Sequence, residues 1–231
     1  MNNSLNPSFS KTPLFNQGVK NEDLVEEGSQ LDVGSTPGAA ERDVQRISDS
    51  FQSAFRPKEM RCLALVAHNN MKPAMKAFVQ TRQEVLKKFR LTGTSTTMTM
   101  LRSIFDSDKD VMYGPTFKSG PLGGDAEVCA LMCQEDLGGI LFFMDPLDPH
   151  PHQCDIDALI RLSNVTNVLF ATNPTSCDAL TFVLEHVLKE ERKDLIPSFF
   201  HTLESPGVSV YKEGQSKLLW KENDLQYDYK W

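Results

Sequence analysis

The sequence lacks three features that would each indicate a different class of protein. No apolar run approaches the roughly 20 residues that span a bilayer, so we expect no membrane partner. Basic residues are in the minority, with 24 Lys and Arg against 31 Asp and Glu, and the net charge of −7 argues against a nucleic-acid partner. The five cysteines are an odd number and form no Cys-x-x-Cys pair.

What is present fits a globular protein with one core. A chain of 231 residues with 40% hydrophobic content can bury a single good-sized core. Four of the five cysteines lie within apolar patterns, and only Cys154 does not. We therefore expect reduced, buried thiols and a cytoplasmic location.

The two ends of the chain differ in composition from its middle. Residues 1–57 are rich in Ser, Asn, Gly, Pro and acidic residues, without the apolar core of a signal peptide or the Arg-rich character of a transit peptide. We expect this extension to be disordered or weakly ordered, with a short helix within 41–55. The C-terminal extension, 205–231, predicts either a hairpin around Glu213–Gly214 or a docking arm. One domain, 58–204, lies between them.

Short apolar runs alternate with helical patterns throughout this domain. Strands are predicted at 62–67, 90–91, 110–115, 138–144 and 167–172. Helices are predicted at 71–89, 96–105, 126–136, 155–165 and 176–191. Such alternation is typical of a three-layer α/β fold, in which a mainly parallel sheet of about five strands carries helices on both faces.

Polar residues follow four of the predicted strands. They are His68, Thr92–Ser95, Asp145 and Thr172–Asn173. In open α/β sheets, ligands bind outside the carboxyl ends of the strands, and these residues would meet at that edge. The sequence therefore predicts a binding site there.

The segment "SGPLGGD", 119–125, places an acid at the start of a helical pattern behind three glycines. Glycines let the backbone approach an anion closely, because they have no Cβ. Asp125 could then act as a base beside a bound anion. The alternative is that Asp125 only caps the following helix, as aspartate often does.

Two further segments have an anion-binding and a structural interpretation. "TGTS", 92–95, offers hydroxyls and backbone N–H groups at a helix start, which suits a phosphate or a simple helix cap. Lys72 lies near the start of a helix, whose dipole attracts anions, but an isolated lysine is commonly solvated. His68 could equally be a structural histidine.

The segment "MDPLDPHPHQCDID", 144–157, is rich in histidine and aspartate. His150 and His152 with nearby carboxylates could bind a divalent metal. Alternatively, His152 is an electrophile or proton shuttle held by Asp145 or Asp155. A third alternative is a solvated acidic loop in which Asp155 caps the next helix.

Together these motifs resemble those of methylglyoxal synthase in order and approximate spacing. The resemblance covers roughly residues 60–200, and the combination of a Gly-Gly-Asp loop with a DPL-x-x-x-PH segment is specific to it. The motifs that carry it are "LVAHNNMK", "TGTS", "SGPLGGD", "FFMDPLDPHPH", "CDIDALIRL" and "NVLFATN".

The resemblance implies a carbon–oxygen lyase that converts dihydroxyacetone phosphate to methylglyoxal and inorganic phosphate without a metal or organic cofactor. It implies that Asp125 abstracts a proton, that His68 and His152 contact substrate oxygens, and that Asp145 and Asp155 orient them. It implies a homohexamer as well. The residues that match its phosphate site are Lys72, Thr92, Gly93, Thr94, Ser95, Ser119 and Gly120. No metal is expected, because His150 falls in the variable part of DPL-x-x-x-PH.

The sequence departs from the family pattern at several positions. Asn69 replaces the usual aspartate, Ser95 a threonine and Thr96 a glycine, and no arginine follows Arg192. These departures leave open the alternative that the protein is a catalytically silent sensor of a phosphorylated metabolite on the same fold. A metal-dependent hydrolase built on His150 and His152 is the other alternative.

Overall fold

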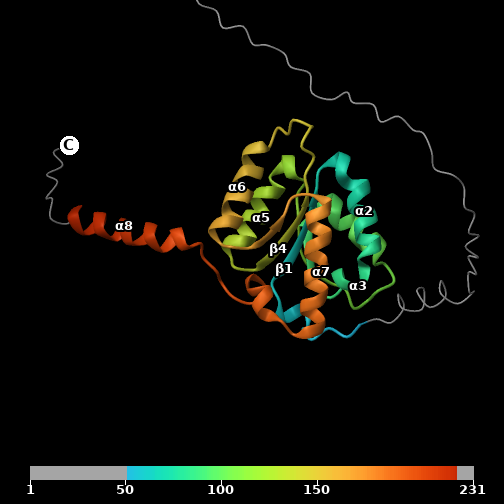
Figure 1. The fold of residues 1–231 in the computed structure, drawn as a ribbon. Coiled ribbons are helices and arrows are strands. Elements are labelled where there is room, and N and C mark those ends of the chain that lie inside the picture. The colour runs from blue at the N-terminus through green and yellow to red at the C-terminus, as the bar shows by residue number, and fades with distance from the viewer. Residues whose placement is uncertain (1–50, 223–231) are drawn as a thin grey trace, which may run out of the picture. The chain divides into compact units, whose positions relative to one another are not determined.

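A computed structural model describes residues 51–222 of the chain. A five-stranded sheet forms its centre, with every pair of neighbouring strands parallel and the order β3-β2-β1-β4-β5 (Figure 1). The strands are β1 Cys62–Ala67, β2 Arg90–Thr94, β3 Met112–Phe117, β4 Leu137–Phe143 and β5 Leu169–Ala171. This sheet confirms the predicted α/β class and strand number.

The central strand β1 shows why the sheet needs cover on both faces. All six of its residues are buried, as expected for an apolar run in a parallel sheet. Successive side chains point to opposite faces, so Leu63 and Leu65 join one core cluster while Ala64 and Val66 join the other.

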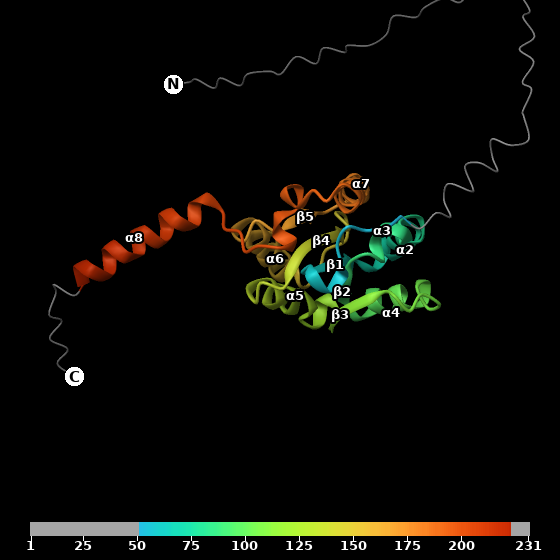
Figure 2. The same cartoon turned by 90° about the horizontal axis from the view of Figure 1, so that it is seen from below.

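Helices supply that cover on both sides (Figure 2). One cluster receives side chains from α2 Lys72–Thr81, α3 Gln83–Leu86, α4 Ser95–Ile104 and α7 Pro174–Glu190. The other receives them from α5 Gly124–Cys133 and α6 Gln153–Val165. Short 3-10 turns are η1 Pro57–Glu59, η2 Asn69–Met71, η3 Gly120–Leu122, η4 Lys193–Leu195 and η5 Pro197–Phe199. The three-layer arrangement is therefore as predicted.

The strand order places a topological switch beside β1. The chain passes from β1 to β2 and β3 on one side, and returns to add β4 on the other. In such sheets the crevice between the diverging connections lies at the carboxyl ends of the strands. His68 directly follows β1, and Asp145 lies two residues after β4, so both lie at the carboxyl ends of their strands.

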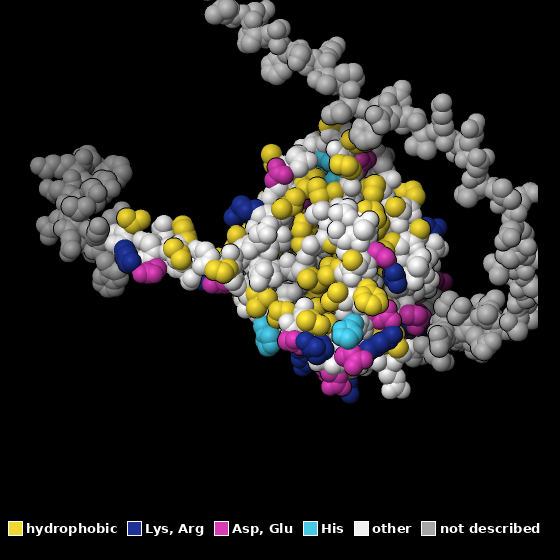
Figure 3. Space-filling view, viewed as in Figure 1, with side chains coloured by type: hydrophobic (Ala, Val, Ile, Leu, Met, Phe, Trp, Pro, Cys, Tyr) yellow, Lys and Arg dark blue, Asp and Glu magenta, His cyan; other side chains and the backbone are white. Residues whose placement is uncertain are grey.

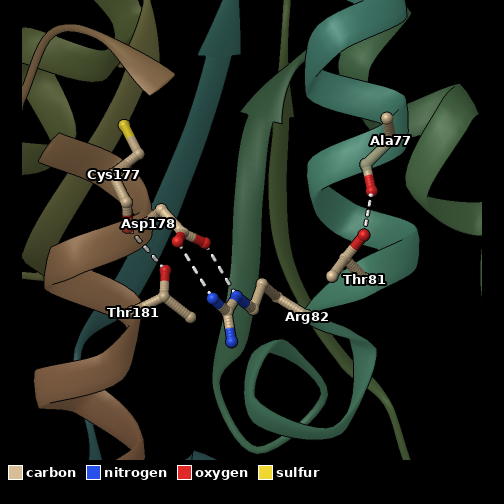
Figure 4. Close-up of polar contacts among 6 residues, drawn as sticks. All are labelled: Ala77, Thr81, Arg82, Cys177, Asp178 and Thr181. Carbon is tan, nitrogen blue, oxygen red and sulfur yellow. Dashed lines mark hydrogen bonds and ion pairs between the residues drawn. The ribbon is translucent and has the colours of Figure 1, made fainter. Parts of the chain in front are cut away.

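The single helix predicted over 71–89 is broken at Arg82, which has φ −110° and ψ 21°. Its guanidinium makes two bonds to Asp178 of α7, Nε–Oδ1 at 2.8 Å and Nη2–Oδ2 at 2.9 Å (Figure 4). In the last turn of α2, the Thr81 hydroxyl donates to the Ala77 carbonyl. No proline or glycine marks this break, so the helical pattern alone did not reveal it.

The hairpin predicted around Glu213–Gly214 is wrong, because this segment lies inside helix α8, Pro206–Glu222. Its Lys, Glu, Gln and Leu residues are good helix formers, and one glycine costs a helix only about 1 kcal/mol. An ion pair one turn apart, Glu213–Lys217 at 2.7 Å, adds support. Helix propensity thus prevails over the turn signal.

Two further predictions, a helix within 41–55 and four buried thiols, are tested at specific residues. Residues 51–55 are not helical, and the rest of the helix predicted within 41–55 lies outside the described residues. Phe55 is buried, and the Ala54 N–H donates to the Leu188 carbonyl at 2.8 Å. Cys133 is exposed, so the prediction of four buried thiols is wrong there.

The surface of the described residues carries apolar side chains at scattered positions. Between residues 51 and 222, no helix is both long and apolar enough to cross a bilayer. In the face drawn in Figure 3, apolar side chains are scattered over the middle, and charged groups gather toward the lower edge. Phe182 of α7 and Leu195 of η4 are among the exposed apolar residues of the chain.

Gly93→Ala is expected to lower the free energy of unfolding by about 1–3 kcal/mol, the usual range for overpacking. A Cβ at this position would lie 2.2 Å from the Leu65 carbonyl oxygen, so β1 and β2 would have to move apart. Gly207→Ala is the control, because its Cβ would meet no atom of the described residues within 4 Å. Urea unfolding of both variants measures the difference. Equal midpoints would contradict the prediction.

Candidate active site

A cavity of about 270 Å³ opens at the switch point. Its wall combines the segments after β1 and β2, the loop before α5 and the loop before α6. The predicted site residues that line it are His68, Lys72, Thr94, Ser119, Gly120, Asp125 and His152. Thr92, Gly93, Ser95, Asp145 and Asp155 do not line it, while Asn69, Thr96, Asp148 and His150 do. The structure therefore brings together residues from four separate motifs.

Asp125 is a buried acid on the cavity wall and does not cap α5. The N-cap is Gly123, and Asp125 is the second helical residue, 1% exposed. Within residues 51–222, neither of its carboxylate oxygens has a hydrogen-bond partner. Burial raises the pKa of this carboxyl, and the nearby His152 partly opposes that rise. An unpartnered carboxylate with a raised pKa is suited to accept a proton.

The glycines before Asp125 make this position possible. A Cβ on Gly124 would lie 2.0 Å from the Lys118 carbonyl oxygen, so the turn into α5 requires glycine. The Gly124 and Leu122 N–H groups both donate to the Ser119 carbonyl, at 3.0 and 2.9 Å. These two donors are therefore used within the loop, and its contribution to the cavity comes from Ser119, Gly120 and Pro121.

His152 is the immediate partner of Asp125. Its Nε2 lies 3.3 Å from Asp125 Oδ2, without the alignment of a hydrogen bond, and both side chains are almost fully buried. The main chain of His152 is the N-cap position of α6. The start of one helix thus holds the histidine against the acid at the start of another.

His68 is held in one tautomer by the main chain. The Asp145 N–H donates to His68 Nδ1 at 2.9 Å, so Nδ1 is the acceptor and the ring proton is on Nε2. That Nε2 is buried and has no partner among the described residues. Burial, with lesser contributions from His150 and His152, lowers the pKa of His68 to about 4. His68 is therefore a neutral hydrogen-bond donor at neutral pH.

The two aspartates predicted to orient this network act differently from one another. The Asp145 carboxylate accepts bonds from the Leu147 N–H at 3.0 Å and from Asn70 Nδ2 at 2.8 Å, which lower its pKa. It orients His68 through its main chain rather than its side chain. Asp155 lies in the first turn of α6, where its charge contributes to the raised pKa of Asp125.

The segments predicted to bind phosphate are only partly directed at the cavity. The Thr92 hydroxyl is used inside the sheet, where it donates to the Pro115 carbonyl at 2.5 Å. Thr94 and Thr96 line the cavity instead. Lys72 provides the one Lys or Arg side chain of the described lining, and its Nζ donates to Asn69 Oδ1 at 2.7 Å. Asn69 is a neutral amide, so this contact is a hydrogen bond and not an ion pair.

His150 is one of the lining residues that were not among the predicted site residues. Its ring lies over that of His68, with the centroids 3.5 Å apart and the planes tilted by 37°. Its Nε2 lies 3.2 Å from the Asp145 carbonyl oxygen. A metal site built on it is not found, since residues 51–222 contain no group of three or more His, Cys, Asp or Glu placed to hold an ion.

The fold and the cavity define a class: an α/β protein whose sheet switch point places a buried acid, a neutral histidine and a lysine around a small cavity. The chain is 38% identical over 125 residues to a methylglyoxal synthase of Rhizobium etli. The aligned residues cover 54% of this chain and 96% of that protein. It is 36% identical over 126 residues to a methylglyoxal synthase of Rhizobium rhizogenes, covering 54% and 97%. The chain belongs to the methylglyoxal synthase family.

Two other comparisons complete this result. A solved methylglyoxal synthase structure from Elizabethkingia anophelis NUHP1 is 32% identical and covers 53% of this chain and 78% of that one, with a TM-score of 0.46. No family model matches the chain. The predicted family resemblance is thus confirmed by the sequence relatives, which favour the enzyme over the silent sensor.

Proposed function

We propose that this protein is an active methylglyoxal synthase, a lyase that converts dihydroxyacetone phosphate to methylglyoxal and inorganic phosphate. The observation that carries the proposal is Asp125, a buried carboxylate on the cavity wall without a hydrogen-bond partner in the described chain. The names of the relatives supply the reaction class. The proposal includes a cytoplasmic location and a homohexamer. The mass of the protein in solution tests the number of subunits.

In this mechanism Asp125 removes a proton from the carbon next to the substrate carbonyl. Its unpartnered oxygens leave it free to accept that proton, and the raised pKa makes it a stronger base than a solvated aspartate. The carboxylate must be ionised to act. Proton removal therefore requires a pH above the raised pKa of Asp125, and the reaction rate falls as the pH drops through it.

The two histidines stabilise the oxygen that gains charge. His68 donates from Nε2, the nitrogen left without a partner in the described residues, and its low pKa keeps it a neutral donor. A positioned donor stabilises the developing enediolate more than it stabilises the ground-state carbonyl. His152, 3.3 Å from the acid, contacts the same region and can pass a proton between oxygens.

The phosphate end of the substrate binds to a lysine and to hydroxyl groups of the cavity lining in this proposal. Lys72 provides charge, while Thr94, Thr96 and Ser119 provide hydroxyl donors around the same cavity. The enediolate then expels phosphate by cleaving the carbon–oxygen bond, and the electron pair of that bond leaves with the phosphate. The product ketonises to methylglyoxal.

The purified full-length protein is expected to release methylglyoxal and phosphate in equal amounts from dihydroxyacetone phosphate, with and without exhaustive chelation. No described cluster of side chains is placed to bind a metal, and each proposed step uses only side chains of this chain. Loss of activity on chelation, restored by zinc or manganese, would support the hydrolase instead. Binding of the substrate without turnover would support the silent sensor.

A further inference from the structure

We propose that His150 is a positioning residue for His68, which covers the face of its imidazole ring and keeps its Nε2 proton available to the substrate. This inference rests on the proposed function, because His68 is there the donor to the substrate oxygen. His150 lies in the variable part of the DPL-x-x-x-PH segment, so the family resemblance assigns it no role.

The two rings are fixed by one residue of the main chain. The Asp145 N–H donates to His68 Nδ1 at 2.9 Å, and the Asp145 carbonyl oxygen lies 3.2 Å from His150 Nε2. A carbonyl can only accept, so His150 Nε2 carries a proton in this contact. The Asp145 side chain is itself held by Asn70 and by the Leu147 N–H. The loop thus sets both imidazoles from a single anchored peptide.

His150 is the closest aromatic neighbour of His68 in the described chain. The ring centroids are 3.5 Å apart, whereas Phe142 and His152 approach His68 in T-shaped arrangements at 4.9 and 5.8 Å. His68 itself is only 6% exposed. Replacing His150 by a small residue would therefore open one face of the His68 ring to water.

Protonation of His68 would disrupt this arrangement. A proton on Nδ1 would face the Asp145 N–H, so two donors would meet where one hydrogen bond now exists. Burial is the main cause that lowers the pKa of His68, followed by His150 and then His152, while the charges of Asp145 and Asp148 oppose it. Lys72 lines the same cavity from α2, and Asp125 from α5. His150 contributes both to the burial and to the electrostatic repulsion.

A nuclear magnetic resonance titration of His68 in the full-length protein tests the proposal without requiring catalysis. In His150→Ala we expect the pKa of His68 to rise from about 4 by about one unit or more, toward the value of a solvated histidine. His150→Phe keeps the ring cover but removes the charge, so its His68 pKa should stay closer to that of the wild type. The His68→Gln variant assigns the signal.

An equal His68 pKa in the wild type and both variants would overturn the proposal. If His150→Ala does not fold, His150→Gln takes its place as the variant without an aromatic ring over His68. Its His68 titration is then compared with that of His150→Phe, which keeps a ring there. Thermal unfolding checks that each variant is folded. A shifted His68 pKa in a protein that releases no methylglyoxal would keep the positioning role and reject the proposed function, so the two failures are distinguishable.

An activity measurement tests whether the positioning of His68 by His150 affects turnover. We expect the ratio of turnover at pH 5 to turnover at pH 8 to fall about twofold or more in His150→Ala relative to His150→Phe, since a His68 with a pKa of about 5 is about half protonated at pH 5, whereas one with a pKa of about 4 is only about a tenth protonated. Both variants lose the same charge near Asp125, so any shared effect on that acid cancels. Equal ratios in the two variants would overturn the catalytic part of the proposal.

Discussion

Asp125→Asn is expected to lower turnover of dihydroxyacetone phosphate at least about a hundredfold, because positioned acid–base groups typically contribute 10²–10⁴-fold. The amide keeps the shape of the side chain but cannot accept a carbon-bound proton. Burial of the site means that water cannot readily replace the missing base, since Asp125 is 1% exposed. Affinity for inorganic phosphate should change little, because Lys72 and the hydroxyls are untouched.

Three measurements on the same protein separate this result from simple damage. Methylglyoxal release gives turnover, exchange of the substrate carbon-bound hydrogen with solvent gives the proton step, and calorimetry gives phosphate binding. Asp157→Asn is the matched control, because that carboxylate is exposed on α6 and bonds to Gln153. Equal methylglyoxal release by Asp125→Asn and the wild type would show that Asp125 is not the base.

Gly120→Ala is expected to reduce kcat/KM about a hundredfold, since a displacement of 1 Å at a catalytic group can cost that much. A Cβ at this position would lie 2.7 Å from His152 Nε2 and 2.9 Å from Asp125 Oδ2. Both atoms belong to the pair that faces the substrate in the proposed mechanism. The new methyl group must displace at least one of them, so binding and turnover should both decline.

Leu122→Ala is the matched control for this variant. Leu122 belongs to the same 3-10 turn, but its side chain is largely exposed and does not line the cavity. The two variants are compared by steady-state kinetics and by thermal unfolding. A Gly120→Ala protein that unfolds like the wild type yet keeps full activity would contradict the close contact with Asp125 and His152.

The layers of the fold could be predicted from local patterns because burial of a parallel sheet leaves a strong signal. A strand covered on both faces must be apolar throughout, and "CLALVA" is buried at every position of β1. The helical segments carry apolar residues at helical spacing, with Pro73 in the first turn of α2, where proline is tolerated. These rules depend on residues near one another in the chain.

Two errors arose where local signals were weak or in competition. The break at Arg82 carries no proline or glycine, and its partner Asp178 is 96 residues away in the sequence. The predicted turn at Glu213–Gly214 had a real local signal, but the surrounding helix formers outweighed it. Neither outcome follows from the composition of the segment alone.

The sequence by itself determined which motifs meet at the carboxyl ends of the strands, and it placed Asp125, His152, His68 and Lys72 among the site residues. Only the tertiary structure decided which atoms face one another. The contact between Asp125 and His152 and the bond from Asp145 to His68 join segments far apart in sequence. Such distances depend on how the helices and loops pack over the sheet, because side-chain packing rather than chain spacing fixes the separation of distant segments.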